Sequence, residues 1–168
     1  MHAGLVSVDE YLHTVYEPDC DYVHGVLVDR NAGEKAHSIV LSETIFALAE
    51  RRRGKDLSVF PITRMRVSPT CYRVPDISVF LGRKPDEEIF TTPPFLFIEV
   101  LSPEDRAGTM LAKICDYLAF GVSYVWLIDP ETREAWIYTR QSVSEVRDGV
   151  LRTREPEIAI PLQELFTN

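Results

Sequence analysis

Two carboxylates occupy positions where a charge is costly. Glu99 lies inside the apolar run 95–101 (FLFIEVL), and Asp76 stands near the start of a second run, 74–81 (VPDISVFL). Such runs, bounded by turn residues, are typical of strands buried on both faces. An unpaired carboxylate there would cost several kcal/mol or take up a proton, and two on neighbouring strands would repel each other. The sequence therefore predicts a divalent metal held by Asp76 and Glu99, with a buried pair satisfied by a lysine or arginine as the alternative.

A lysine on the helix after the Glu99 strand could complete such a site. At about 100° per residue, Lys113 falls about 120° from the centre of the expected buried stripe. That stripe consists of Ala107, Met110, Leu111, Ile114 and Leu118. Lys113 could reach Glu99 from there, position or deprotonate an attacking water, and offset charge on a phosphoryl transition state. The alternative is an ordinary surface lysine, and Asp116 is expected to be solvated on the opposite face.

The elements that must position these residues alternate along the chain. Helical patterns begin after Ser7, which forms a capping box with Glu10, at about residue 34, and at Ser102, the last one ending at Gly121. Strand-like runs cover 22–29, 57–67, 74–81, 95–101, 123–128 and 134–139, with a further hairpin at 148–149. This order predicts an α/β fold with a mixed central sheet flanked by helices and extra C-terminal hairpin strands, in a single domain over residues 1–168.

The charge is unevenly distributed. The chain carries a net charge of −8, but residues 51–84 hold nine Lys or Arg against two Asp. Basic side chains make phosphate contacts, so this segment could bind a nucleic-acid backbone on an otherwise acidic protein. The predicted contacts are Arg51, Arg52, Arg53, Arg64, Arg66 and Arg73. A solvated helix end and strand-face arginines are the alternative explanation.

Cysteine usage and hydropathy favour a soluble cytoplasmic protein. The three cysteines form no C-x-x-C pair, which argues against a disulfide framework or a zinc cluster and for a reducing compartment. The first residues lack the pattern of a signal peptide, and no apolar stretch approaches the roughly 18 residues that span a bilayer. We therefore expect no membrane partner.

The acidic strands and the helix after them resemble a known group of nucleases. Pro75-Asp76 and Glu99-Val100-Leu101 resemble the PD-(D/E)XK nuclease superfamily, except that Leu101 stands at the lysine position. One branch shares this departure, the Uma-two family of restriction endonucleases. The resemblance to that family rests on residues 98–103 (IEVLSP), Lys113, Tyr117, 121–122 (GV), 124–126 (YVW) and 128–130 (IDP), and it runs from residue 8 to residue 166.

The resemblance implies a restriction-endonuclease-like fold, Mg²⁺ or Mn²⁺ as cofactor, DNA as partner, and Lys113 in place of the lysine missing at residue 101. It also implies a further acid four residues before Gly25, which is Asp21 where glutamate is usual. The backbone carbonyl of Val100 would be another metal ligand beside Asp76, Glu99 and Asp21. His37 matches a recurrent family position, although a lone helical histidine is more often a polar-edge residue.

Two functions remain open. One is a metal-dependent DNA endonuclease of PD-(D/E)XK type, with Asp76, Glu99, Lys113 and Asp21 as catalytic residues and a homodimer expected because two sites suit two strands. Cleavage of RNA or another phosphodiester would share the same site. The other is a non-catalytic nucleic-acid or protein binding module on a nuclease fold. Convergence of the four residues on one open cleft favours the enzyme, whereas a Lys113–Glu99 pair in a closed core favours the module.

Overall fold

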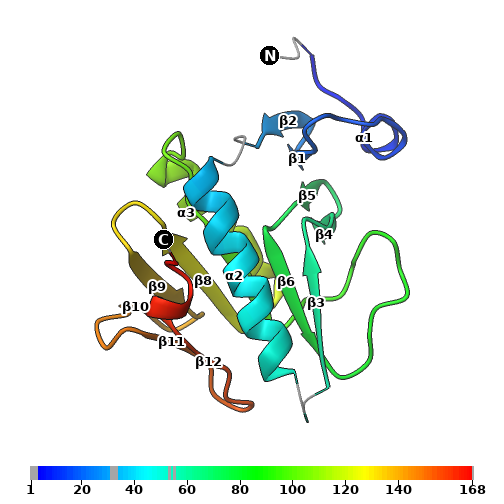
Figure 1. The fold of residues 1–168 in the computed structure, drawn as a ribbon. Coiled ribbons are helices and arrows are strands. Elements are labelled where there is room, and N and C mark those ends of the chain that lie inside the picture. The colour runs from blue at the N-terminus through cyan, green and yellow to red at the C-terminus, as the bar shows by residue number, and fades with distance from the viewer. Residues whose placement is uncertain (1–3, 31–33, 53, 55, 168) are drawn as a thin grey trace.

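A central six-stranded sheet organises the molecule (Figure 1). A computed structural model describes residues 4–30, 34–52, 54 and 56–167. The strand order is β10-β9-β8-β7-β6-β3, in which β7 and β8 run parallel and the other neighbours run antiparallel. These strands are β3 (Leu57–Pro61), β6 (Ile77–Leu81), β7 (Leu96–Val100), β8 (Tyr124–Asp129), β9 (Glu134–Tyr138) and β10 (Val143–Glu145).

One helix covers each face of this sheet. Helix α2 (Lys35–Arg51) crosses one face and packs on a core that contains Leu48, Ile98 and Trp126 (Figure 1). Helix α3 (Ala107–Phe120) packs on the opposite face, in a core that contains Phe97 and Ile114. The central strands β7 and β8 are apolar on both sides because each side meets a helix.

A smaller four-stranded sheet lies beyond one end of the central sheet (Figure 1). Its order is β2-β1-β5-β4, and every pair in it is antiparallel. The strands are β1 (Cys20–Val23), β2 (Val26–Asp29), β4 (Met65–Ser68) and β5 (Cys71–Arg73). Helix α1 (Val8–His13) packs on it through Tyr11, which stacks on Tyr22 with ring centroids 5.0 Å apart.

The C-terminal part of the chain adds short elements at the side of the central sheet. Strands β11 (Val150–Arg152) and β12 (Ala159–Pro161) form a hairpin, and the 3₁₀ helix η1 (Leu162–Glu164) follows directly. Leu151, Ile160 and Leu162 from these elements belong to the core under α2. The predicted fold class, a mixed sheet flanked by helices with extra C-terminal strands, is confirmed. Among the helices of the described residues, none combines the length and apolar character that crossing a bilayer requires.

Three local predictions were wrong in detail. The strand expected over 57–67 breaks at Ile62, whose φ of +46° turns the chain, so that β3 and β4 belong to different sheets. The helix expected to begin at Ser102 begins at Ala107, because Ser102 and Asp105 instead close a turn in which the Ser102 N–H donates to Asp105 Oδ2 (2.7 Å). The Ser7 cap of α1 is confirmed, but the helix ends at His13 rather than near Glu17.

A fourth difference concerns the buried side of α3. Leu111 was expected in the core but is 49% exposed, and Ala107 is exposed too. The residues that are buried are Met110, Lys113, Ile114 and Tyr117. The buried face is thus turned by about 70° from the position that the apolar residues predict, at 100° per residue. This rotation brings two polar side chains, Lys113 and Tyr117, under the sheet.

Candidate active site

Asp76 lies where the central sheet opens, just before β6. Extending the Ile77–Ile98 pairing of β6 and β7 by one residue places Asp76 opposite Glu99. The Val100 N–H donates to Asp76 Oδ2 (2.9 Å). A side-chain oxygen thus takes the place of the backbone carbonyl that would accept this bond in a continued sheet. This bond holds the Asp76 carboxylate beside the backbone of the residue that follows Glu99.

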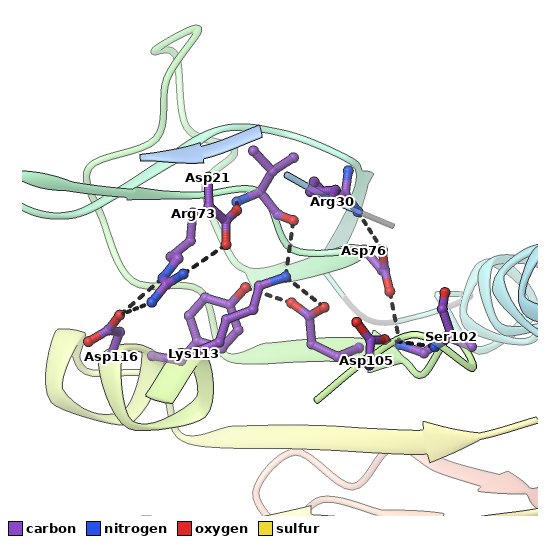
Figure 2. A network of polar contacts seen from close by, with 12 residues as sticks. Asp21, Arg30, Arg73, Asp76, Ser102, Asp105, Lys113 and Asp116 are labelled. Atoms are coloured by element: carbon purple, nitrogen blue, oxygen red, sulfur yellow. Dashed lines mark hydrogen bonds and ion pairs between the residues drawn. The ribbon is translucent and has the colours of Figure 1, made fainter. Parts of the chain in front are cut away.

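Two cationic or titratable side chains also contact Asp76. Arg30 Nη2 lies 2.6 Å from Oδ1, and His37 Nε2 lies 3.3 Å from Oδ2 (Figure 2 shows the Arg30 contact). Burial alone would raise the pKa of Asp76, but His37, Lys113, Arg30 and the Val100 amide together hold that pKa below its ordinary value. Asp76 is therefore a buried carboxylate held in its ionised form.

Glu99 is fully enclosed and is held at both oxygens. Lys113 Nζ donates to Oε2 (2.9 Å), and the Tyr117 hydroxyl donates to Oε1 (2.6 Å). Burial raises the pKa of Glu99 to about 7; Lys113 and Tyr117 oppose the rise, and the nearby charge of Asp76 adds to it. In the absence of a bound cation, this carboxyl group therefore takes up a proton near neutral pH.

Lys113 comes to Glu99 from α3, one turn before Tyr117. Its Nζ also lies 3.5 Å from the Val74 carbonyl, at the chain segment that leads to Asp76. Burial lowers the pKa of Lys113, but the charges of Glu99, Asp21 and Asp76 outweigh that effect and raise it above its ordinary value. Lys113 thus stays protonated as a fixed positive charge between the carboxylates.

Asp21 on β1 is buried near the other three residues, but its oxygens bind protein groups. Oδ1 accepts the Val74 N–H (2.8 Å) and Oδ2 accepts Arg73 Nη1 (2.9 Å). Arg73 in turn donates to Asp116 Oδ2 from both Nε (3.0 Å) and Nη2 (2.6 Å), so that the guanidinium lies between two aspartates (Figure 2). Asp116, expected to be solvated, instead anchors α3 to β5.

All four predicted side chains line one pocket. Its volume is about 70 Å³, room for a cation and a few waters, and its walls come from both sheets, α2 and α3. The lining includes Asp21, Arg30, His37, Asp76, Glu99, Val100, Ser102, Asp105 and Lys113. The structure has one feature from each of the two alternatives. The residues converge on a pocket, and Lys113 also pairs with Glu99 inside it.

The chemical type of the donor atoms suits a hard cation, but their arrangement in this structure does not yet form a metal site. Asp76, Glu99 and the Val100 carbonyl offer oxygen atoms, the kind of ligand that Mg²⁺ and Mn²⁺ prefer. Within the described ranges, however, no three His, Cys, Asp or Glu side chains lie close enough together to hold a metal. Asp21 is drawn toward Arg73, and Arg30 and Lys113 contact the other two carboxylates. The set that fits a metal is thus two carboxylates and a carbonyl.

The arginines predicted to bind nucleic acid do not gather at this pocket. Arg51 donates to the Ala159 carbonyl and to Glu164, and Arg64 forms a bidentate pair with Asp19 over the Tyr11 ring. Arg73 is the buried bridge described above, so these three have structural partners. Arg52 and Arg66 are exposed, and Arg53 lies outside the described residues. Arg52 stands about 22 Å from His37 along α2, at 1.5 Å per residue.

Three residues of the site were missed or given too little weight in the sequence. Tyr117 follows Lys113 by four positions, so the shared helix face was a usable signal. His37, expected at a polar helix edge, has a side chain only 13% exposed and faces Asp76. Nothing in the sequence indicates Arg30, because its contact with Asp76 joins positions 46 residues apart.

Comparison with known proteins decides the family. The family model Uma2, described as "Putative restriction endonuclease", matches residues 8–165. The chain belongs to the Uma2 family. The resemblance predicted from the IEVLSP motif and its surroundings is thereby confirmed. No curated protein matches this Uma2 chain significantly.

A solved structure agrees with the fold of this Uma2 chain. It is the crystal structure of "a putative nuclease belonging to DUF820" from Anabaena variabilis ATCC 29413. The two share 24% sequence identity over 96% of this chain and 97% of the other, with a TM-score of 0.82. At that identity the likeness shows a common Uma2-type fold, and the chemistry must be argued from the site itself.

Proposed function

We propose that this protein is a metal-dependent nuclease that hydrolyses phosphodiester bonds, with DNA as the substrate suggested by its family. The observation that carries the proposal is the convergence of Asp76, Glu99 and Lys113 on one pocket beside the Val100 backbone. A structural ion pair alone would not require a second buried carboxylate from the neighbouring strand. Two acids that could hold a divalent cation, with a lysine beside them, supply groups that hydrolysis of a phosphodiester by a metal-bound water can use.

The carboxylates would hold the cation. Asp76, Glu99 and the Val100 carbonyl are the proposed ligands, and Mg²⁺ or Mn²⁺ bound there would lower the pKa of a water and neutralise charge on the phosphate. Asp21, predicted as a ligand, takes a supporting role in this proposal. Its bonds to Arg73 and the Val74 N–H tie β1 to the segment that carries Asp76.

The protein groups around the carboxylates orient them. Tyr117 and Lys113 fix the two oxygens of Glu99, and the Val100 amide and His37 fix one oxygen of Asp76. Lys113 keeps its proton, so it acts as a positive charge that positions the attacking water or stabilises the phosphate oxygens rather than as a base.

A non-catalytic binding module is the second candidate. Three observations favour it. Lys113 and Arg30 already pair with the two carboxylates, and Arg51, Arg64 and Arg73 are engaged within the protein. The acidic side chains of Asp29 and Asp105 at the pocket would also disfavour a phosphate unless a cation is bound.

Calorimetric titration with Mn²⁺ combined with a cleavage assay tests the proposal. The wild type should bind Mn²⁺ and nick supercoiled DNA, and Asp76→Asn and Glu99→Gln should each lose at least about 100-fold in cleavage rate. Glu88→Gln is the matched control, since Glu88 is exposed on a loop and its loss removes the same charge. A wild type that binds no Mn²⁺ and cuts neither DNA nor RNA would favour the binding module.

A further inference from the structure

Arg30 binds one oxygen of Asp76, and both side chains line the pocket. Its Nη2 lies 2.6 Å from Asp76 Oδ1, while Oδ2 is taken by the Val100 N–H and His37. Oδ1 is therefore the oxygen left for a metal, and the guanidinium is on it. Figure 2 shows Arg30 reaching Asp76 from the side opposite Ser102 and Asp105.

Each of the three buried carboxylates at the pocket already has a cationic partner without a metal. Three carboxylates, Asp21, Asp76 and Glu99, are paired with three cations, Arg73, Arg30 and Lys113 respectively. Arg73 and Lys113 are held at several points in the interior, by Asp116 and by the Val74 carbonyl. Arg30 differs from them because it follows the last residue of the edge strand β2 and its side chain is 17% exposed.

A divalent ion cannot be added to this arrangement without cost. Mg²⁺ binds carboxylate oxygens at about 2.0–2.1 Å, so an ion on Asp76 Oδ1 would share that oxygen with the Arg30 guanidinium. Like charges at such a separation repel strongly in a partly buried site. Of the three cations, Arg30 has the most exposed side chain (17%, against 5% for Arg73 and 10% for Lys113), and among the described residues its one ion-pair partner is Asp76.

From this arrangement we infer that Arg30 is a built-in competitor for the metal site, and that a divalent cation binds Asp76 by displacing its guanidinium. The inference rests on the proposed function, since it concerns the same metal. The apparent affinity for the metal equals the intrinsic affinity multiplied by the fraction of molecules in which the Arg30–Asp76 pair is open. If the pair is closed about nine-tenths of the time, metal binding is about tenfold weaker. The free protein is thereby held in a stable metal-free form at low cation concentration.

Mn²⁺ binding by charge variants at Arg30 tests the inference without any activity assay. Titration calorimetry, or the decrease of the free Mn²⁺ electron paramagnetic resonance signal, gives the dissociation constant for each protein. Arg30→Gln should bind Mn²⁺ about tenfold more tightly than the wild type. Arg30→Lys, which keeps the charge, should stay close to the wild type. Arg52→Gln should not change binding, because it removes the same charge from an exposed position at the far end of α2.

The outcomes separate this inference from the proposed function. Equal or weaker Mn²⁺ binding by Arg30→Gln, with binding lost in Asp76→Asn, would overturn the competition and leave the metal site standing. Binding by Arg30→Gln when the wild type binds nothing measurable would support the competition in its strongest form. Absence of binding in both proteins, each shown to be folded by circular dichroism, would overturn the metal site itself and the inference with it.

Discussion

Nζ of Lys113 lies 2.9 Å from Oε2 of Glu99, and both side chains are buried between α3 and the central sheet. The pair carries the cost of removing two charges from water, which the Val74 carbonyl and the Tyr117 hydroxyl offset by further hydrogen bonds. Removing one partner leaves the other buried and unpaired. This coupling makes the site testable through stability as well as through activity.

Loss of the lysine should destabilise the fold. Lys113→Met should lower the free energy of unfolding by about 3 kcal/mol at pH 8, because Glu99 would lose its cation and would have to stay buried as an unpaired charge or take up a proton. The double variant Lys113→Met with Glu99→Gln should recover part of that loss in urea denaturation. Lys35→Met, at an exposed position of α2, is the control and should change stability by less than about 0.5 kcal/mol. If the losses of stability in Lys113→Met and Glu99→Gln simply add up in the double variant, the two residues are not coupled.

The raised pKa of Glu99 predicts a pH dependence of stability. The folded metal-free protein holds the Glu99 proton up to a pKa of about 7, whereas the unfolded chain releases it near the ordinary glutamate value of 4.5. The folded state thus binds more protons in this window, so the free energy of unfolding should fall as pH rises from about 4.5 to about 7.

Glu99→Gln provides the control for that slope, since glutamine cannot titrate. Chemical denaturation at several pH values in the presence of a chelator should give a flatter profile for the variant than for the wild type between about pH 4.5 and 7. Parallel profiles would mean that Glu99 is ionised throughout this range. Asp76 does not contribute to this slope, because its lowered pKa means that it titrates below pH 4.5.

The Asp21–Arg73–Asp116 bridge should be structural. Arg73→Gln should lower the free energy of unfolding by about 3 kcal/mol, because Asp21 would be left as an unpaired buried charge. Arg66→Gln removes the same charge from an exposed residue of the adjacent strand β4 and should change stability by less than about 0.5 kcal/mol. Thermal unfolding of the two variants and of the wild type makes the comparison. If Arg73→Gln is as stable as Arg66→Gln, the bridge does not stabilise the fold.

The three cysteines should differ in reactivity. Burial raises the pKa of Cys20 and of Cys71 to about 11, whereas Cys115 lies exposed on α3. At pH 8 an aromatic disulfide reagent should therefore modify one thiol in the native protein and three after unfolding in guanidinium. Cys115→Ala should abolish the native reaction. Rapid modification of a second thiol in the native state would mean that the small sheet opens readily.

Local physical chemistry was enough to find the elements and two members of the site. The buried runs around Asp76 and Glu99 predicted strands because continuous apolar sequence is stable only where both faces are covered, and β6 and β7 carry these residues. The Ser7 cap and the Gly121 terminus were equally predictable, since each depends on a single residue type in a fixed helical position.

Pairings between distant residues were decided only by the tertiary structure. The rotation of α3 that buries Lys113 is stabilised by Glu99 on another element, and apolar periodicity carries no information about such a partner. Arg73 and Arg64 were indistinguishable in sequence from surface cations, because what makes them structural is Asp21, Asp116 and Asp19 in space. The contact of Arg30 with Asp76 likewise depends on how β2 ends beside β6. The sequence by itself thus determined which carboxylates are buried at a cost in free energy, and the fold decided which cations neutralise them.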